Sequence, residues 1–155
     1  MYGEKEKCKE QIDFDNQFLQ ETDKSFKTRS EASKYFSAKG WEYFYKDDSD
    51  TAVKRFNQAW LLDKSNYEVY WGFGNIYGKA GKENEALKMF NLAKQHNPEN
   101  ANFYISSASA YGALYNKKQS STILSKMIED LNKASAIDPK NARAYAELAA
   151  AYTYI

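Results

Sequence analysis

Few residues of this chain have the types and spacing that catalysis or metal binding requires. The only histidine, His96, has no second histidine and no thiol in its segment, so we interpret it as a surface cation near the end of a helix. The only cysteine, Cys8, can form no disulfide within the chain and has no neighbouring histidine. Glu6 and Lys7 before it favour a plain surface cysteine over the lipid-bearing cysteine of an exported protein. The sequence therefore predicts no catalytic residues, no metal and no cofactor.

Two other patterns begin like ligand-binding loops without completing them. Gly72-Phe73-Gly74 resembles part of a dinucleotide fingerprint, but its third glycine would fall on Tyr77 and no strand precedes it. Asp47, Asp48 and Asp50 could hold a cation, but their spacing lacks the glycine and terminal glutamate of a calcium loop. We interpret Gly74 as a helix-packing position and the aspartates as a solvated turn.

The composition is that of one globular domain. With 155 residues, the chain is long enough to bury about 70% of the surface that its unfolded form exposes. It has 22 basic and 21 acidic side chains and no cluster of Lys and Arg, so we expect no nucleic-acid partner. No apolar run approaches the ~20 residues of a membrane span, and the charged first ten residues contain no signal peptide. We expect a soluble protein, either cytoplasmic or exported after removal of a signal that this chain lacks.

The elements that position these residues follow an internal repeat. Six residues recur 34 positions later: Gly40, Tyr43, Ala52, Phe56, Ala59 and Asn66 return as Gly74, Tyr77, Ala86, Phe90, Ala93 and Asn100. The next interval is 41 residues, since Ala93, Pro98 and Asn100 return as Ala134, Pro139 and Asn141. The third unit has therefore gained seven residues. Ala108 and Tyr111 return as Ala149 and Tyr152, which begins a fourth unit.

Each repeat unit is predicted to contain two helices. Apolar residues fall on one helical stripe in both second helices: Ala86, Leu87, Phe90 and Ala93 in one, and Val53, Phe56, Ala59 and Trp60 in the other. Small residues on facing helices let their axes approach closely, and the large aromatic residues fill the flanking space. Pro98 and Pro139 end the second helices. In the turns, we predict Asp50 as an N-cap and Gly81 as a left-handed C-cap.

The seven extra residues of the third unit lie around 116–121. Seven residues are about two helical turns, so one alternative lengthens each of two antiparallel helices by about one turn. The other alternative is a longer loop. The stripe of Ile123, Leu124, Met127, Ile128 and Leu131 favours longer helices.

The repeat resembles the tetratricopeptide family. Unit two carries the whole pattern of that family: Tyr70, Phe73, Gly74, Tyr77, Ala86, Phe90, Ala93 and Pro98. Unit one departs from it at Lys39 and Lys64, and unit three at Ser107 and Met127. The resemblance implies an all-α fold, a right-handed superhelical stack of antiparallel helix pairs of the α-solenoid type. The lack of candidate catalytic residues predicts that the chain is not an enzyme. We expect repeats at 33–66, 67–100 and 101–141, a further first helix at 142–155, and an N-terminal arm or capping helix at 1–32, with a capping box at Thr28 and Glu31.

The resemblance also implies a binding surface, because first helices line the concave groove in this family. By register, the candidate groove residues are Lys34, Ser37, Trp41, Phe44, Tyr45, Glu68, Trp71, Asn75, Lys79, Asn102, Ile105, Ser109, Ala113, Arg143, Ala146, Ala150 and Tyr154. An alternative interpretation packs Trp41, Phe44 and Tyr45 under the N-terminal arm. That alternative does not apply to Trp71, which is therefore the clearer candidate for ligand contact.

One subgroup of the family grips the C-terminal carboxylate of a peptide with a clamp of Lys, Asn and Arg. In this chain only Asn75 fits a clamp position, while Ser37, Trp41, Asn102 and Ser106 replace the others. We therefore predict no binding of chaperone tails.

The C-terminal helix is apolar over much of its circumference, with Tyr145, Leu148 and Tyr152 as the candidate end interface. We expect this end to dock onto another chain, such as a second copy, or to be covered by further sequence. The leading functional hypothesis is a scaffold or interaction module that binds a peptide or partner helix. The alternative is a structural protein that assembles through its terminal helices.

Overall fold

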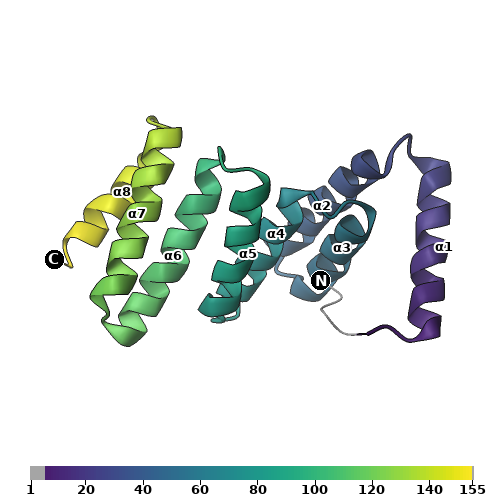
Figure 1. Cartoon of the computed structure of the whole chain (residues 1–155), viewed down its shortest axis with the longest axis horizontal. Coiled ribbons are helices and arrows are strands. Elements are labelled where there is room, and N and C mark those ends of the chain that lie inside the picture. The colour runs from purple at the N-terminus through teal and green to yellow at the C-terminus, as the bar shows by residue number, and fades with distance from the viewer. Residues whose placement is uncertain (1–5, 155) are drawn as a thin grey trace. The chain divides into compact units, whose positions relative to one another are not determined.

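The computed structural model describes residues 6–154, which form helices and no strands, so the predicted all-α class is confirmed. The chain divides into two compact units between Phe73 and Gly74. The helices are α1 (Lys9–Ser25), α2 (Arg29–Tyr45), α3 (Ser49–Leu62), α4 (Tyr67–Lys79), α5 (Glu83–His96), α6 (Ala101–Lys118), α7 (Ser121–Ile137) and α8 (Ala142–Tyr152), as Figure 1 shows. Within the described residues, no helix is long and apolar enough to cross a membrane.

The first unit is packed around Phe56 of α3. This side chain is fully buried. A Cβ at Gly40 of α2 would lie 2.7 Å from the Phe56 ring, and a Cβ at Gly72 of α4 would lie 2.3 Å from it. Both helices therefore approach the ring closely because glycine has no side chain, as the pairing of small and large residues predicts at Gly40.

A polar contact fixes the start of α4 in the same unit. The side-chain amide of Asn66 donates to Ser33 Oγ (2.8 Å) and Ser37 Oγ (3.3 Å), and Asn66 Oδ1 accepts from the backbone N–H of Glu68 (3.1 Å). Ser33 Oγ in turn donates to the Ala59 carbonyl oxygen (2.8 Å). The prediction that Ser37 faces the groove is wrong, because its side chain is buried under this network.

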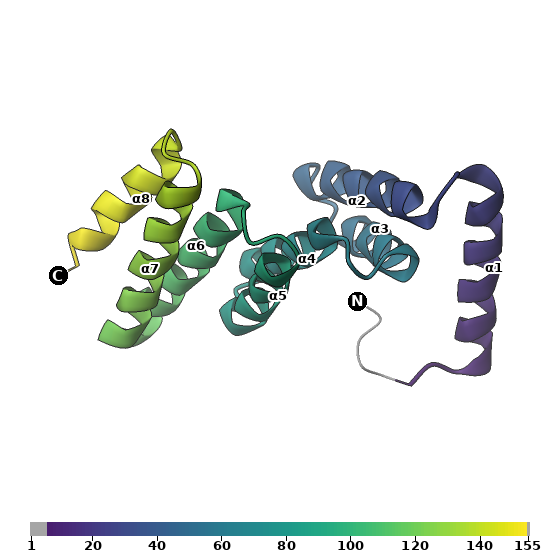
Figure 2. The same ribbon diagram turned by 45° about the horizontal axis from the view of Figure 1, so that its top comes forward.

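Helix α1 packs on the first half of α2. Phe18 lies 5.3 Å from Phe36, and Phe26 lies 5.5 Å from Tyr35, measured between ring centroids. Figure 2 shows α1 standing across the direction of α2. Thr28 Oγ1 accepts from the backbone N–H of Glu31 (3.1 Å), which is one of the two hydrogen bonds of the predicted capping box.

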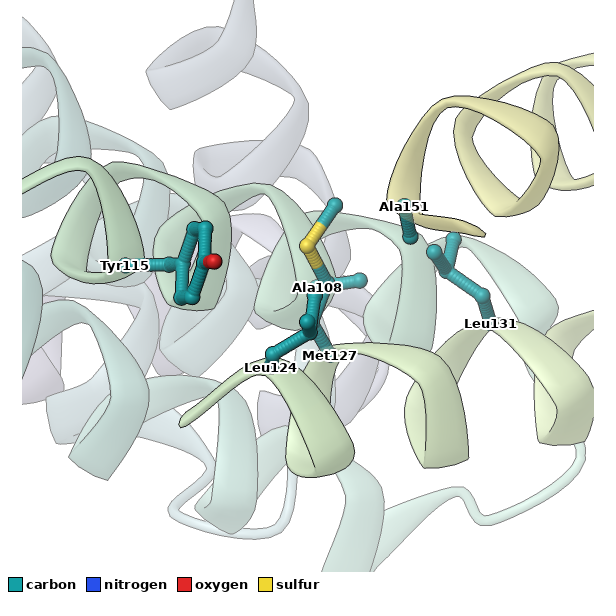
Figure 3. Packing of buried hydrophobic residues seen from close by; sticks show 6 residues of the cluster. All are labelled: Ala108, Tyr115, Leu124, Met127, Leu131 and Ala151. Carbon is teal, nitrogen blue, oxygen red and sulfur yellow. The ribbon is translucent and has the colours of Figure 1, made fainter. Parts of the chain in front are cut away.

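The second unit repeats the packing of small against large side chains. A Cβ at Gly74 of α4 would lie 2.3 Å from the Phe90 ring of α5. In the next helix pair, Ala108 and Leu131 take the positions of Gly74 and Phe90, and both are fully buried. Figure 3 shows Leu131 in one cluster with Ala108, Met127 and, from α8, Ala151. Ala108 is larger than Gly74, and Leu131 is smaller than Phe90. The two changes offset each other, so the packed volume is conserved.

The seven extra residues of the third unit lengthen its helices. Helix α6 has 18 residues where α4 has 13, and α7 has 17 where α5 has 14. The connection between α6 and α7 is only Gln119 and Ser120, with Gln119 in the left-handed region (φ 49°). Of the two alternatives, the structure has longer helices and not a longer loop.

The turns between paired helices use a left-handed residue. After α4, Gly81 has φ 69°, its N–H donates to Gly78 O (3.0 Å), and Lys82 N–H donates to Tyr77 O (2.9 Å). This is the Schellman arrangement, and it confirms the predicted role of Gly81. Asp47 has φ 66° at the position 34 residues earlier.

The predicted N-cap at Asp50 is wrong. Helix α3 begins two residues earlier, and Asp48 Oδ1 accepts from the backbone N–H of Thr51 (3.0 Å). Asp50 instead lies in the first helical turn, where a negative charge still favours the helix dipole.

Candidate functional site

An aromatic cluster covers the part of α2 that faces α4 in the first unit. Trp41, Phe44 and Tyr45 lie three and four residues apart, so the helix brings them to one side, and Trp71 of α4 completes the cluster. The ring centroid of Trp41 lies 4.6 Å from Trp71, 5.6 Å from Phe44 and 5.9 Å from the stacked ring of Tyr45. Phe56 supports Trp41 from within the core at 5.4 Å.

The cluster remains accessible although its rings contact one another. Tyr45 is 76% exposed, and Trp41 and Trp71 are half-buried. The ring contacts of Trp41 and Tyr45 are with α2, α3 and α4, whereas Phe18 and Phe26 of the N-terminal segment contact Tyr35 and Phe36. The alternative in which the N-terminal arm covers Trp41, Phe44 and Tyr45 stays a prediction, because these ring contacts describe only part of the arm.

Glu68 places a carboxylate at the edge of the aromatic cluster. The indole Nε1–H of Trp41 donates to Glu68 Oε2 at 2.7 Å. The Asn66 cap holds the backbone of Glu68 at the start of α4, which fixes this side chain next to Trp41. Burial raises the pKa of Glu68 above its ordinary value of 4.5, and the smaller effect of the Trp41 hydrogen bond opposes that rise. Lys34, another predicted groove residue of this unit, is exposed.

Several predicted groove residues of the second unit are polar, and some of them are paired with one another. Arg143 Nε donates to Glu147 Oε1 (2.7 Å), and Arg143 Nη2 donates to Ser109 Oγ (3.3 Å). Ser109 Oγ also donates to Glu147 Oε2 (3.1 Å). Asn102 and Lys79 are exposed, and Asn75 is half-buried.

The prediction that Ile105 faces the groove is wrong. Its side chain is 1% exposed and belongs to a buried cluster with Ala101, Ala134 and Ala144. Helix α6 therefore presents Asn102 and Ser109 to solvent while it buries the residue between them.

The candidate end interface on α8 is partly exposed. Tyr145 and Tyr152 are 48% and 53% exposed. Leu148 is half-buried because it packs on the cluster that contains Leu131 and Ala151. The outward face of α8 is thus aromatic at two positions.

His96 and Cys8 are exposed and belong to different helical segments. Among residues 6–154, no three or more His, Cys, Asp and Glu side chains are grouped so that they could hold a metal ion.

Known proteins resemble the chain in structure more than in sequence. No model of a known protein family matches it. A 66-residue segment is 32% identical to Protein bimA of Emericella nidulans and covers 43% of this chain, but only 8% of that protein.

Solved structures match over most of the chain. The first TPR of Spaghetti (RPAP3) bound to an HSP90 peptide has a TM-score of 0.70 at 22% identity, covering 80% of this chain and 93% of that one. The chain has the tetratricopeptide repeat fold. The TPR domain of Arabidopsis OM64 has a TM-score of 0.70 at 18% identity, covering 82% and 99%. The Yersinia enterocolitica type III secretion chaperone SycD, with a YopD peptide, has a TM-score of 0.66 at 14% identity, covering 80% and 95%.

Within this tetratricopeptide fold, the repeat register predicted Trp41 and Glu68 as separate groove residues. It did not predict the hydrogen bond between them. The two residues are 27 positions apart and lie on successive first helices. A tryptophan near the end of one first helix and a glutamate at the start of the next are the sequence signal for this pairing.

Proposed function

We propose that the chain is a non-enzymatic interaction module that binds an extended peptide or a partner helix on the aromatic cluster, with Trp71 as the central anchor. The observation that carries this proposal is the accessible set of four aromatic rings on α2 and α4, beside a half-buried carboxylate. Binding hot spots combine rigid aromatic anchors with a few polar groups, because aromatic rings bury a large area at low cost in entropy.

The structural neighbours support a peptide as the ligand class. The Spaghetti domain was solved with a peptide of HSP90 and SycD with a peptide of YopD. Two different peptides on one fold indicate that surface side chains, and not the backbone, choose the ligand. For this chain, the proposed contact residues are Lys34, Trp41, Tyr45, Glu68 and Trp71 in the first unit and Asn75, Lys79, Asn102 and Arg143 in the second.

The boundaries of the module follow the repeat. We propose one helix pair at 33–66, a second at 67–100, an extended third at 101–141 and a further first helix at 142–155. Residues 1–32 then act as an arm or cap on the first pair, which accords with the contacts of Phe18 and Phe26. Repeat stacks need such covers because the outer face of a terminal repeat is otherwise apolar.

Acidic chaperone tails are not the proposed ligand. Trp41 stands at a position where the carboxylate clamp needs a polar donor, and Glu68 adds negative charge beside it. A calorimetric titration with a peptide ending in Glu-Glu-Val-Asp should therefore show no saturable binding. Saturable binding would contradict this part of the proposal.

Substitution of Trp71 tests the proposed function. Peptides selected from a randomised display library on the full chain should bind Trp71→Ala at least about tenfold more weakly, as expected for a hot-spot aromatic residue. Trp60→Ala is the matched control, because Trp60 is a half-buried tryptophan of α3 outside the aromatic cluster. Circular dichroism checks that both variants stay helical. If the selected peptides bind Trp71→Ala and the parent chain with equal affinity, the proposal is wrong.

Assembly through α8 is a second candidate function. The exposed rings of Tyr145 and Tyr152, with Leu148 between them, favour it, because exposed aromatic residues are enriched in interfaces. Sedimentation equilibrium should then show self-association that Tyr152→Ser weakens. A monomer over the micromolar range would leave only the interaction module.

A further inference from the structure

Glu68 is a partly buried carboxylate of the first unit, and no positively charged side chain of the described residues pairs with it. Its Oε2 accepts the Trp41 N–H, and its Oε1 accepts no hydrogen bond from residues 6–154. No Lys, Arg or His side chain of the described chain forms an ion pair with it. By contrast, Glu42 pairs with Lys39 and Lys46.

We propose that Glu68, with Trp41 and Trp71, forms a subsite for a lysine or arginine side chain of the bound peptide. This inference rests on the proposed function and deepens it, because it names the charge of the ligand. An ammonium or guanidinium group donates to Glu68 Oε1, which leaves the Trp41 hydrogen bond to Oε2 in place.

The geometry brings a cation at Oε1 within reach of the indole rings. Trp41 Nε1 is 2.7 Å from the other oxygen of the same carboxylate. Trp71 follows Glu68 by three residues on α4, so the two side chains are neighbours on one helix face. A cation attracted to an indole ring acts over about 6 Å, and the attraction grows when water is displaced. The carboxylate therefore supplies the counter-charge, and the neighbouring indole rings supply the aromatic surface beside it.

The surroundings of Glu68 also discriminate against other ligands. Burial disfavours the ionised carboxylate, which is why its pKa is raised, and no cation of the chain offsets this cost. A cationic side chain of the ligand offsets the cost of burying the ionised Glu68 carboxylate, whereas a neutral side chain does not. An acidic side chain adds repulsion. Specificity arises from these differences between ligands.

The test compares peptides selected on four forms of the full chain. The randomised library is selected on the parent chain, Glu68→Gln, Glu31→Gln and Trp71→Ala. Gln keeps an acceptor for Trp41 but has no charge, and Glu31 is an exposed glutamate of α2 that serves as the matched control. We expect Lys and Arg to be enriched about fivefold or more at one peptide position on the parent and on Glu31→Gln, and to fall within about twofold of their library frequency on Glu68→Gln.

Two outcomes separate this inference from the proposed function. Peptides that need Trp71 but show no cationic preference, or keep it on Glu68→Gln, overturn the subsite and leave the interaction module standing. Peptides that bind Trp71→Ala equally well overturn both.

A direct probe covers the case in which no peptide is selected. N-acetyl-arginine amide is titrated while the indole N–H signal of Trp41, identified with Trp41→Phe, is followed by NMR. The signal should shift and saturate in the parent, and should shift at least about fivefold less in Glu68→Gln. Equal shifts in the two forms, or a titration with N-acetyl-norleucine amide that gives the same response, overturn the subsite.

Discussion

The two units make the same contact between successive first helices with different chemistry. Glu68 and Arg143 occupy one repeat position, and Trp41 and Ser109 occupy another. In the first unit, Trp41 donates to Glu68 at 2.7 Å. In the second, Arg143 donates to Ser109 at 3.3 Å. The backbone therefore brings the same two positions together twice, with the sign of the charge reversed.

The difference between these contacts lies in how each charge is balanced. Arg143 has its counter-charge one helical turn away in Glu147, at 2.7 Å. Glu68 has no such partner within the described chain, and it is held against tryptophan rings. A charge that is balanced internally contributes to structure, whereas an unbalanced one in a partly buried position favours a ligand of opposite charge. We therefore expect ligand recognition mainly in the first unit.

Removal of the positive partner in the Lys94–Asp130 ion pair of the second unit should have the largest effect. Lys94 Nζ donates to both carboxylate oxygens of Asp130 (2.8 Å each) and to Ser107 Oγ (3.0 Å), and the two charged side chains are only 15% and 14% exposed. Lys94→Met makes Asp130 an unbalanced carboxylate like Glu68. We expect the free energy of unfolding in urea to fall by about 2–3 kcal/mol.

A double variant separates the charge from the packing. Lys94→Met combined with Asp130→Leu should recover most of that loss, because an apolar pair of similar volume leaves no buried charge without a partner. If the double variant is less stable than Lys94→Met alone, the loss comes from packing and the comparison of charges between the units does not hold.

Gly81 and Asp47 occupy equivalent repeat positions in the two units, and both have a left-handed backbone conformation. Gly81→Ala should lower the free energy of unfolding by about 1 kcal/mol, because its φ of 69° disfavours any residue with a Cβ. Asp47, at the equivalent position with φ 66°, has the same backbone conformation, so Asp47→Gly removes backbone strain and should cost less stability than Gly81→Ala. Denaturant unfolding curves measure both. A loss of stability in Asp47→Gly as large as that in Gly81→Ala would contradict this equivalence.

Glu68→Gln should have a smaller and pH-dependent effect. Burial raises the pKa of Glu68 in the folded chain. The contribution of this side chain to folding stability is therefore complete below its ordinary pKa of 4.5 and is lost as the pH rises through the raised pKa. Glutamine stays neutral, so the variant should become more stable than the parent as pH increases from 4 to 7, by about 0.5 kcal/mol at the upper end. Unfolding curves across this range check the sign. If the parent chain becomes more stable relative to Glu68→Gln as the pH rises, this prediction is wrong.

Arg143→Ala should have the smallest effect. Its side chain is 63% exposed, and solvent screens its pairing with Glu147. We expect a change in unfolding free energy within about 0.5 kcal/mol and a loss of peptide affinity of about twofold at most, which is far smaller than that of Trp71→Ala. A loss of peptide binding comparable to that of Trp71→Ala would mean that the second unit takes part equally in recognition.

The amino-acid sequence determined the repeat and the ends of several of its helices. The recurring glycine, alanine and phenylalanine residues indicate which side chains pack together in the core. The volume available at a close helix crossing depends on the residue types there. The recurrence of Asn66, Asn100 and Asn141 had no predicted role, yet each caps a first helix through its side chain. Local rules gave Gly81 correctly but missed Asp48, because neighbouring aspartates can both serve as a cap.

Tertiary structure alone decided which predicted surface residues are accessible and which charges are balanced. Helical register placed Ser37 and Ile105 on the groove face, but packing against other helices buries both. The bonds from Trp41 to Glu68 and from Lys94 to Asp130 join residues 27 and 36 positions apart. Sequence periodicity fixes the direction of a side chain from its own helix, whereas burial and pairing depend on the distance to neighbouring helices, which only the folded chain sets.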